Sequence, residues 1–430
     1  MLLEFSFSNF RSFRHDVHFS TIADEKYGAE RDFLLPIPGI VEEKALPVVA
    51  IYGGNAAGKT NFVQALTCLR RLVLKGNLKG VEAFRLDKQL RNTDFSIYLA
   101  SEGKVYRFTL CVNKDTVVAE KLEILENSEL MSIYERTVTC GVRLTRRYLP
   151  DISDEVYDYV TQQWGRLPAS QILLHHAIVM RDSMLNDLLQ PVYDWFRYTL
   201  TIIRPESRRL TLGAELQHSP ELFTEVMEAA DTGIEGIRFV DVPLESAGIP
   251  SEKIELFLHN DDANAIVSSK DPALVVVKED GKAAAKYCCI LHYMEDGTPQ
   301  IFPLSTESDG TMRYMNLVPT LLETRKGEHP HVYIIDELDR SLHYLLSRRY
   351  IEQHLELARQ GRETQLIFTT HDLMLMDAKL LPKDALWAAE RNRRHESAMI
   401  SFNDFVEYEN DTDIRESYLA GRMGGIPQFS

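Results

Sequence analysis

The segment GGNAAGKT, from Gly53 to Thr60, has residues of the types and spacing that bind phosphate. It lies between an apolar run and apolar residues at helical spacing, so we expect a strand, a tight loop and a helix N-terminus. Glycines let the loop curl around an anion, and unpaired N–H groups of the helix point at it. A glycine-rich turn without function fits this context poorly. The candidate nucleotide-binding residues are Gly53, Gly58, Lys59, Thr60 and Asn61.

Two of these side chains have expected roles of their own. The ammonium of Lys59 should reach the β- and γ-phosphates of a nucleotide such as ATP, and the hydroxyl of Thr60 should bind Mg²⁺. ATP and Mg²⁺ are therefore the expected cofactors.

A second apolar run, VYIIDE, ends in the carboxylates Asp336 and Glu337. We expect a buried central strand whose end faces the nucleotide, with Asp336 holding Mg²⁺ through water. Glu337 would be the catalytic group that polarises the attacking water. A buried strand with an acidic end would explain the same letters without chemistry, but the phosphate-binding segment upstream favours the catalytic interpretation.

A third apolar run, TQLIFTTHD, places His371 at the end of another predicted strand. At the same edge of the sheet, an imidazole can contact the terminal phosphate and sense its hydrolysis. The alternative is a histidine with a purely structural role.

The residues SDGT, Ser308 to Thr311, open a predicted helix shortly before the acidic strand. A helix that begins with Ser-Asp-Gly-Thr offers a second anion site, and nothing near it in sequence supplies the anion. We expect Ser308 and Gly310 to contact a γ-phosphate held by a second subunit, which requires at least a dimer. The alternative is an ordinary N-capped helix, since serine and aspartate are favoured caps.

The elements around these motifs predict an α/β fold with a mixed parallel and antiparallel sheet and a helical insertion. Four alternating segments in series indicate an antiparallel sheet, and residues from about 151 to 230 change to helical periodicity. The expected division is into residues 1–120 and 234–430, the two halves of one main domain, separated by a mostly helical insertion at 121–233. The four alternating segments are DFSIYLA, KVYRFTLCV, TVVAEKLEIL and MSIYERTV.

Composition limits the location and the partners. The 430 residues are 44% hydrophobic, but no apolar run is long enough to cross a bilayer and the N-terminus does not resemble a signal peptide. We therefore expect a cytoplasmic protein without a membrane partner. A net charge of −16 disfavours nucleic acid as the main partner, although the basic runs at 208–210 and 391–394 could contact it.

Taken in order, the motifs resemble the ABC-type ATPase head. NFRSF (Asn9–Phe13) ahead of GxNxxGKT resembles the OLD-like and SMC-like branch of that family. Four further matches resemble the prokaryotic ATPases of phage-defence loci, such as the RloA type and the ATPase of PARIS systems. These matches are FRLD (Phe84–Asp87), ESDGT, DELDRSLH and YLAGRMGGIP.

The resemblance implies roles for further residues. Arg11 would approach the nucleotide, Asn55 would contact the γ-phosphate or water, and Asp339 would belong to the loop that contacts a second subunit. SDGT stands where transporters have an SGG form, so its role follows from position. Gln89 is the candidate for the glutamine that completes the Mg²⁺ shell in relatives.

The resemblance also implies an ATP hydrolase of an antiviral defence system of the abortive-infection type. It would act as a sensor or scaffold that controls a partner effector encoded nearby, a nuclease, for instance of the Toprim type. The alternative is a DNA-repair ATPase that acts directly on DNA, as SMC-like and RecF-like proteins do. A nuclease activity of its own is disfavoured, because only about 60 residues follow His371 and no acidic DxD metal cluster is evident there in a plausible fold of its own.

Overall fold

The chain forms two compact units. The first contains Met1–Ile202, His329–Leu338 and His354–Ser430, and the second contains Ile203–Glu328 and Asp339–Gln353. A computed structural model describes residues 1–27, 31–87, 91–180, 184–205, 220–259, 265–268, 271, 273–405 and 414–425.

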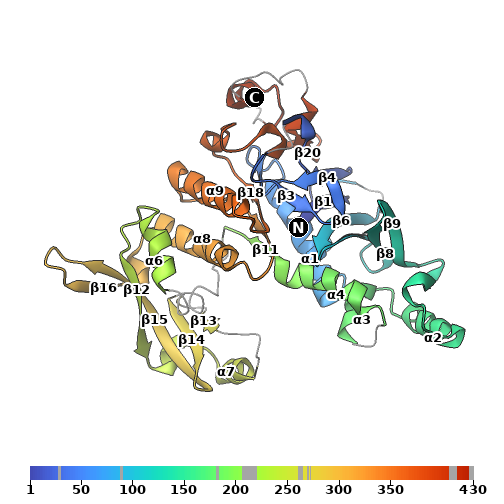
Figure 1. Cartoon of the computed structure of the whole chain (residues 1–430), viewed down its shortest axis with the longest axis horizontal. Coiled ribbons are helices and arrows are strands. Elements are labelled where there is room, and N and C mark those ends of the chain that lie inside the picture. Colours follow the sequence, from blue (N-terminus) through green and yellow to red (C-terminus); the bar gives the residue numbers. More distant parts are fainter. Residues whose placement is uncertain are drawn as a thin grey trace. The chain divides into compact units, whose positions relative to one another are not determined.

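The first unit contains a six-stranded mixed sheet, whose strands lead to the phosphate loop, the acidic pair and His371 (Figure 1). Strands β17, β18, β5 and β19 run parallel, and β20 pairs antiparallel with β19. Every residue of β5 is buried, as expected for a central strand with both faces covered. In spatial order the strands are β11 (Leu200–Ile203), β17 (His331–Ile335), β18 (Thr364–Thr369), β5 (Val48–Tyr52), β19 (Leu386–Arg391) and β20 (Ser397–Ser401).

A seven-stranded antiparallel sheet belongs to the same unit. The four alternating segments of the sequence form β6 to β9 of this sheet, which confirms the antiparallel pairing expected for them. In spatial order the strands are β10 (Gly141–Leu144), β9 (Glu129–Thr137), β8 (Val117–Glu126), β7 (Lys104–Val112), β6 (Thr93–Ser101), β1 (Leu2–Ser8) and β2 (Val17–Ser20). A separate hairpin pairs β3 (Leu35–Ile37) with β4 (Ile40–Ala45).

Helix α1 (Lys59–Lys75) links the phosphate loop to the core of this unit. Its buried stripe includes Phe62, Leu66, Leu69 and Val73, the apolar positions that predicted a helix. The Phe62 ring lies 4.9 Å from the Phe19 ring and 5.9 Å from the Phe5 ring, between centroids. Because β1 and β2 supply those two rings, the antiparallel sheet fixes the helix that begins at the phosphate loop.

Three helices follow the antiparallel sheet in the chain: α2 (Asp154–Gly165), α3 (Leu173–Val179) and α4 (Asn186–Asp194). Helix α3 contacts α1 and α4 (Figure 1). Buried Glu120 on β8 accepts the N–H groups of Leu173 (2.7 Å) and Leu174 (2.8 Å), and burial raises the pKa of its carboxyl group. Helix α9 (Tyr344–Arg359) has residues in both units, and α10 (Ile414–Leu419) lies in the first.

The second unit is built on a five-stranded antiparallel sheet. Its strands follow the order β12 (Gly236–Val242), β15 (Lys282–Tyr293), β14 (Leu274–Glu279) and β13 (Ala265–Val267), and β16 (Pro299–Pro303) also pairs with β15. Its helices include α6 (Pro220–Glu228), α7 (Ser251–Leu258) and α8 (Asp309–Lys326).

The structure has the mixed α/β fold that the sequence predicts, but it divides the chain differently from the three expected segments. The segment 121–233 contains β9 and β10 as well as helices, and α6 belongs to the second unit. Residues 234–328, expected in the C-terminal half of one head, belong to the second unit and contain a separate sheet as well as α7 and α8. An alternating pattern predicts a strand but not the sheet it joins, because strand pairing depends on contacts distant in sequence. No helix in the described ranges is long and apolar enough to cross a membrane.

Candidate nucleotide site

The loop between β5 and α1 has an unusual backbone conformation. Gly53, Ala56 and Gly58 have positive φ angles of 146°, 62° and 123°. A Cβ atom on Gly53 would lie 2.5 Å from the carbonyl oxygen of Ala389, and one on Gly58 would lie 2.7 Å from Ser397 Oγ. The loop therefore lies directly on β19 and β20, and only glycine fits at these two positions.

Lys59, the first residue of α1, lies inside the curve of this loop. Its side chain is buried, and Nζ donates to the carbonyl oxygens of Gly53 (2.7 Å) and Gly54 (3.2 Å). The same Nζ lies 3.0 Å from Nε2 of His371. Because an ammonium group can only donate, this histidine nitrogen must be the acceptor of the bond. A phosphate that entered the loop would replace these neutral partners with charged oxygens.

The acidic pair follows β17, the second strand along from β5. Asp336 is buried, and its Oδ1 accepts a hydrogen bond from Thr369 Oγ1 (2.6 Å). The same threonine hydroxyl accepts the N–H of Glu337 (2.8 Å), whose φ is 50°. A positive φ is uncommon for a glutamate, and such strain concentrates at functional sites. Thr369, the last residue of β18, therefore holds the carboxylate of Asp336 and the backbone of Glu337.

A hollow of about 270 Å³ lies over the loop. It brings together seven of the predicted residues: Asn55, Gly58, Lys59, Thr60, Asn61, Glu337 and His371. The remaining lining residues are Ser12, Gly54, Ala56, Ala57 and Arg391. Loop N–H groups, an ammonium and a guanidinium form a donor set that fits a polyphosphate. Oxygen atoms of Thr60 and the nearby carboxylates are of the kind that Mg²⁺ prefers.

Arg11 does not line this hollow, contrary to the expectation for the NFRSF motif. Its Nη2 lies 2.8 Å from Glu82 Oε1, and its N–H donates to the Glu82 carbonyl oxygen (2.8 Å). Instead, Ser12 lines the hollow, and its Oγ accepts hydrogen bonds from Asn61 (2.8 Å) and Ser397 (2.8 Å). Arg11 has a φ of 52°, which turns the chain at this point. The sequence motif NFRSF does not predict this turn.

Sequence reasoning also missed functional candidates beyond Ser12. From the sequence, Arg391 belongs to a basic run that could contact nucleic acid, and its position directly after the apolar segment LWAAE is the signal that could have placed it at the site. Gly54 N–H donates to the Gly425 carbonyl oxygen (3.1 Å), so the C-terminal segment also supports the loop. Gln89 and residues 208–210 lie outside the described residues.

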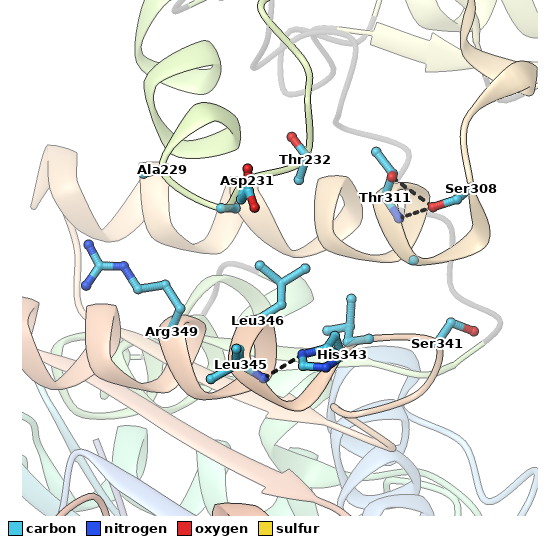
Figure 2. Close-up of a pocket in the computed structure, with 13 residues that line it drawn as sticks. Ala229, Asp231, Thr232, Ser308, Thr311, Ser341, His343, Leu345, Leu346 and Arg349 are labelled. Atoms are coloured by element: carbon cyan, nitrogen blue, oxygen red, sulfur yellow. Dashed lines mark hydrogen bonds between the residues drawn. The ribbon is translucent and has the colours of Figure 1, made fainter.

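The SDGT motif lies in the second unit, at the start of α8. Ser308 caps this helix: its Oγ accepts the N–H of Thr311 (3.1 Å). A Cβ atom on Gly310 would lie 2.7 Å from the Ser341 carbonyl oxygen, so the helix start touches the loop that follows Asp339. Ser308, Gly310 and Thr311 line a hollow of about 550 Å³. Figure 2 shows the other contributors, which include Asp231, Thr232, His343 and Arg349.

Comparison with known proteins agrees with the first unit's motifs. A family model described as "AAA domain, putative AbiEii toxin, Type IV TA system" matches residues 48–377, well over half of the chain. The match includes the phosphate loop, both carboxylates and His371. The chain belongs to this AAA-domain family. It thus has the ATPase domain that its phosphate loop predicts.

Two solved structures cover most of the chain at low similarity. One is an SMC head bound to the C-terminal winged-helix domain of ScpA, with 13% identity, a TM-score of 0.40, and coverage of 93% of this chain and 96% of that chain. The other is the SMC head domain from Thermotoga maritima, with 14% identity, a TM-score of 0.38, and coverage of 93% and 98%. No curated protein matches the sequence.

Substitution of Gly53 tests the loop geometry. We expect Gly53→Ala to destabilise the protein by about 2 kcal/mol or more, because the left-handed φ and the Ala389 carbonyl both oppose a Cβ atom. Gly165→Ala is the matched control, since nothing lies within 4 Å of its added Cβ. Thermal unfolding of both variants gives the comparison. Equal melting temperatures would contradict the described loop.

Proposed function

We propose that the protein is a Mg²⁺-dependent ATP hydrolase that works as at least a dimer and controls a partner effector in antiviral defence. The observation that carries the first part is the arrangement of Lys59, Glu337 and His371 around one hollow over the phosphate loop. Three elements distant in sequence supply these side chains. Their convergence is what an ATP-hydrolysing site requires.

Each residue has a distinct role in the proposed reaction. Loop N–H groups and Lys59 bind the phosphates. Thr60 and Asp336 would hold Mg²⁺, which would supply positive charge to the phosphate oxygens. Glu337 orients a water molecule and accepts its proton as the water oxygen attacks the γ-phosphorus and ADP leaves. His371, in contact with Lys59 Nζ, lies where it can respond to the terminal phosphate.

The second site, at the start of α8, supports assembly into a dimer. Ser308 and Gly310 form an anion-binding helix start that belongs to a different unit from the phosphate loop. We propose that they contact the γ-phosphate bound by a second copy of the chain, with the loop after Asp339 at the same interface. ATP would then hold two subunits together until hydrolysis.

The defence role rests on the family and on the motif resemblance. The family description names a putative AbiEii toxin and a type IV toxin–antitoxin system. FRLD, DELDRSLH and YLAGRMGG resemble the phage-defence ATPases. A nuclease encoded nearby, for instance of the Toprim type, is the effector we propose for it.

Helix α2 is the surface we propose for that effector. Val156 and Tyr159 are 41% and 63% exposed on this helix, and Asp154, Glu155 and Asp158 are exposed beside them. The carboxylates repel a phosphate backbone. A protein with an apolar pocket and a basic rim would bind the apolar side chains and the carboxylates of α2 together. Protein is therefore favoured over DNA as the partner.

The catalytic assignment predicts that Glu337→Gln binds ATP but loses at least about 100-fold in turnover, because an amide cannot accept the proton of water. Lys59→Ala should lose ATP binding itself, since the ammonium would no longer neutralise the phosphates. Glu328→Gln, a change of an exposed glutamate before β17, is the control. Phosphate release and nucleotide binding are measured for all three. Full hydrolysis by Glu337→Gln would disprove the role of this carboxylate.

The dimer assignment predicts complementation between two inactive variants. Lys59→Ala lacks a working phosphate loop, and Ser308→Arg blocks the helix start, so neither should hydrolyse ATP alone. A mixture can form dimers in which the intact loop of one subunit faces the intact SDGT motif of the other. We expect the mixture to recover up to about a quarter of wild-type activity if subunits mix at random and single sites work. No recovery, with each variant folded, would contradict a shared site.

The partner surface is tested on the product of the adjacent gene. We expect the wild-type chain to bind this product and Tyr159→Ala/Asp158→Lys to bind it at least about tenfold more weakly. Glu129→Lys changes the first residue of β9 and is the control, because it changes the net charge by the same amount at a site outside α2. Unchanged binding by the double variant would exclude α2. Tight, salt-sensitive DNA binding that depends on the helices would instead favour a repair ATPase.

A further inference from the structure

The turn between β19 and β20 is rigidly built, although its sequence RNRRHES reads as a solvated basic run. Asn392 organises it: Oδ1 accepts the N–H groups of Arg394 (2.9 Å) and Glu396 (3.0 Å). The Asn392 N–H donates to the Glu396 carbonyl oxygen (2.9 Å). His395 completes the turn with a φ of 64°. The hairpin therefore presents its side chains in fixed directions.

This turn is attached to the N-terminal motif beside the phosphate loop. Arg14 Nη1 lies 2.8 Å from Glu396 Oε1, and the Arg14 guanidinium lowers the pKa of this carboxyl group. Ser397 N–H donates to the Ser12 carbonyl oxygen (2.7 Å), and Ser12 Oγ bonds Asn61 of α1. The end of β19 is thus held against the residues that begin α1.

Arg391 is the last residue of β19 and lines the hollow over the phosphate loop. Its Nε donates to the His395 carbonyl oxygen (3.3 Å), which leaves the Nη groups of the guanidinium for other contacts. The two neighbouring carboxylates have other partners: Glu390 Oε2 accepts the Gly425 N–H (3.2 Å), and Glu396 pairs with Arg14. The strand β19 and the turn after it therefore direct the positive charge of Arg391 to the hollow.

The strand order indicates which phosphates Arg391 would meet. Strands β18 and β17 lie on one side of β5 and supply His371 and Glu337, which mark the side of the terminal phosphate. Strand β19 lies on the other side of β5, so Arg391 flanks the loop opposite Glu337. This step rests on the proposed function, since it takes Glu337 as the group beside the γ-phosphate.

We propose that Arg391 is a nucleotide-binding residue whose guanidinium contacts the α- and β-phosphates. Its planar fork of donors suits phosphate oxygens better than a lysine would. Because ADP and ATP share these two phosphates, Arg391 strengthens the binding of both nucleotides equally. It thereby differs from a contact to the γ-phosphate, which would favour ATP alone.

The test measures the affinity of fluorescent ADP and ATP analogues for the full chain. We expect Arg391→Ala to weaken both about tenfold, the typical effect of one partly exposed charged hydrogen bond, and Arg391→Lys to weaken them less. Arg393→Ala and Arg394→Ala remove equal charge from the same turn and should bind both analogues like the wild type. Arg391→Ala should also reduce the salt dependence of binding, which a merely structural role would not change.

The binding results for the wild type and for Arg391→Ala distinguish a failure of the role of Arg391 from a failure of the proposed function. If the wild type binds both nucleotides and Arg391→Ala binds them equally well, Arg391 is not a ligand of the nucleotide. If only ATP binding weakens, the contact is to the γ-phosphate and the assignment to the inner phosphates is wrong. A wild-type chain that binds neither nucleotide would overturn the proposed function and the role of Arg391 with it. A lower melting temperature of nucleotide-free Arg391→Ala would identify a structural effect and contradict direct binding.

Discussion

The carboxyl ends of β17, β18, β5 and β19 lie at one edge of the six-stranded sheet, because these four strands run parallel. Each strand delivers one group to that edge: Glu337, His371, the phosphate loop and Arg391. The parallel arrangement thus brings four groups that are distant in sequence to the same hollow. The antiparallel sheet serves it indirectly, since β1 and β2 supply the rings against which Phe62 fixes α1.

The backbone at this edge is strained, and its packing maintains the strain. Ala56 and Glu337 have positive φ angles, which cost on the order of 1 kcal/mol each for residues with a Cβ atom. Thr369 holds Glu337 and Asp336 together, while Ala389, Ser397 and Gly425 support the loop. These contacts restrict the conformations of the loop and of Glu337, and such restriction lowers the ordering entropy that opposes binding.

The sequence predicted the parts of the site that follow from local patterns. Apolar runs identified β5, β17 and β18, and Lys59, Glu337 and His371, which follow these runs in the sequence, line one hollow. Arg391 was not predicted, because a run of basic residues looks the same in the sequence whether its side chains are solvated or are fixed by a β-hairpin. Arg11 was misplaced because the turn at this residue, and not the motif, decides which side chain faces the loop. The separate sheet of the second unit could not be predicted either, because contacts between residues distant in sequence decide which strands pair.

The proposed function and the role of Arg391 both require that a nucleotide binds in the hollow over the phosphate loop. Amide hydrogen exchange of the full chain with and without ADP and Mg²⁺ tests it most directly, because bound phosphates would occupy the loop N–H groups. We predict slower exchange in residues 53–61, with α2 and the second unit's β15–β16 hairpin unchanged. Nucleotide binding that leaves residues 53–61 unprotected and slows exchange elsewhere would contradict the account.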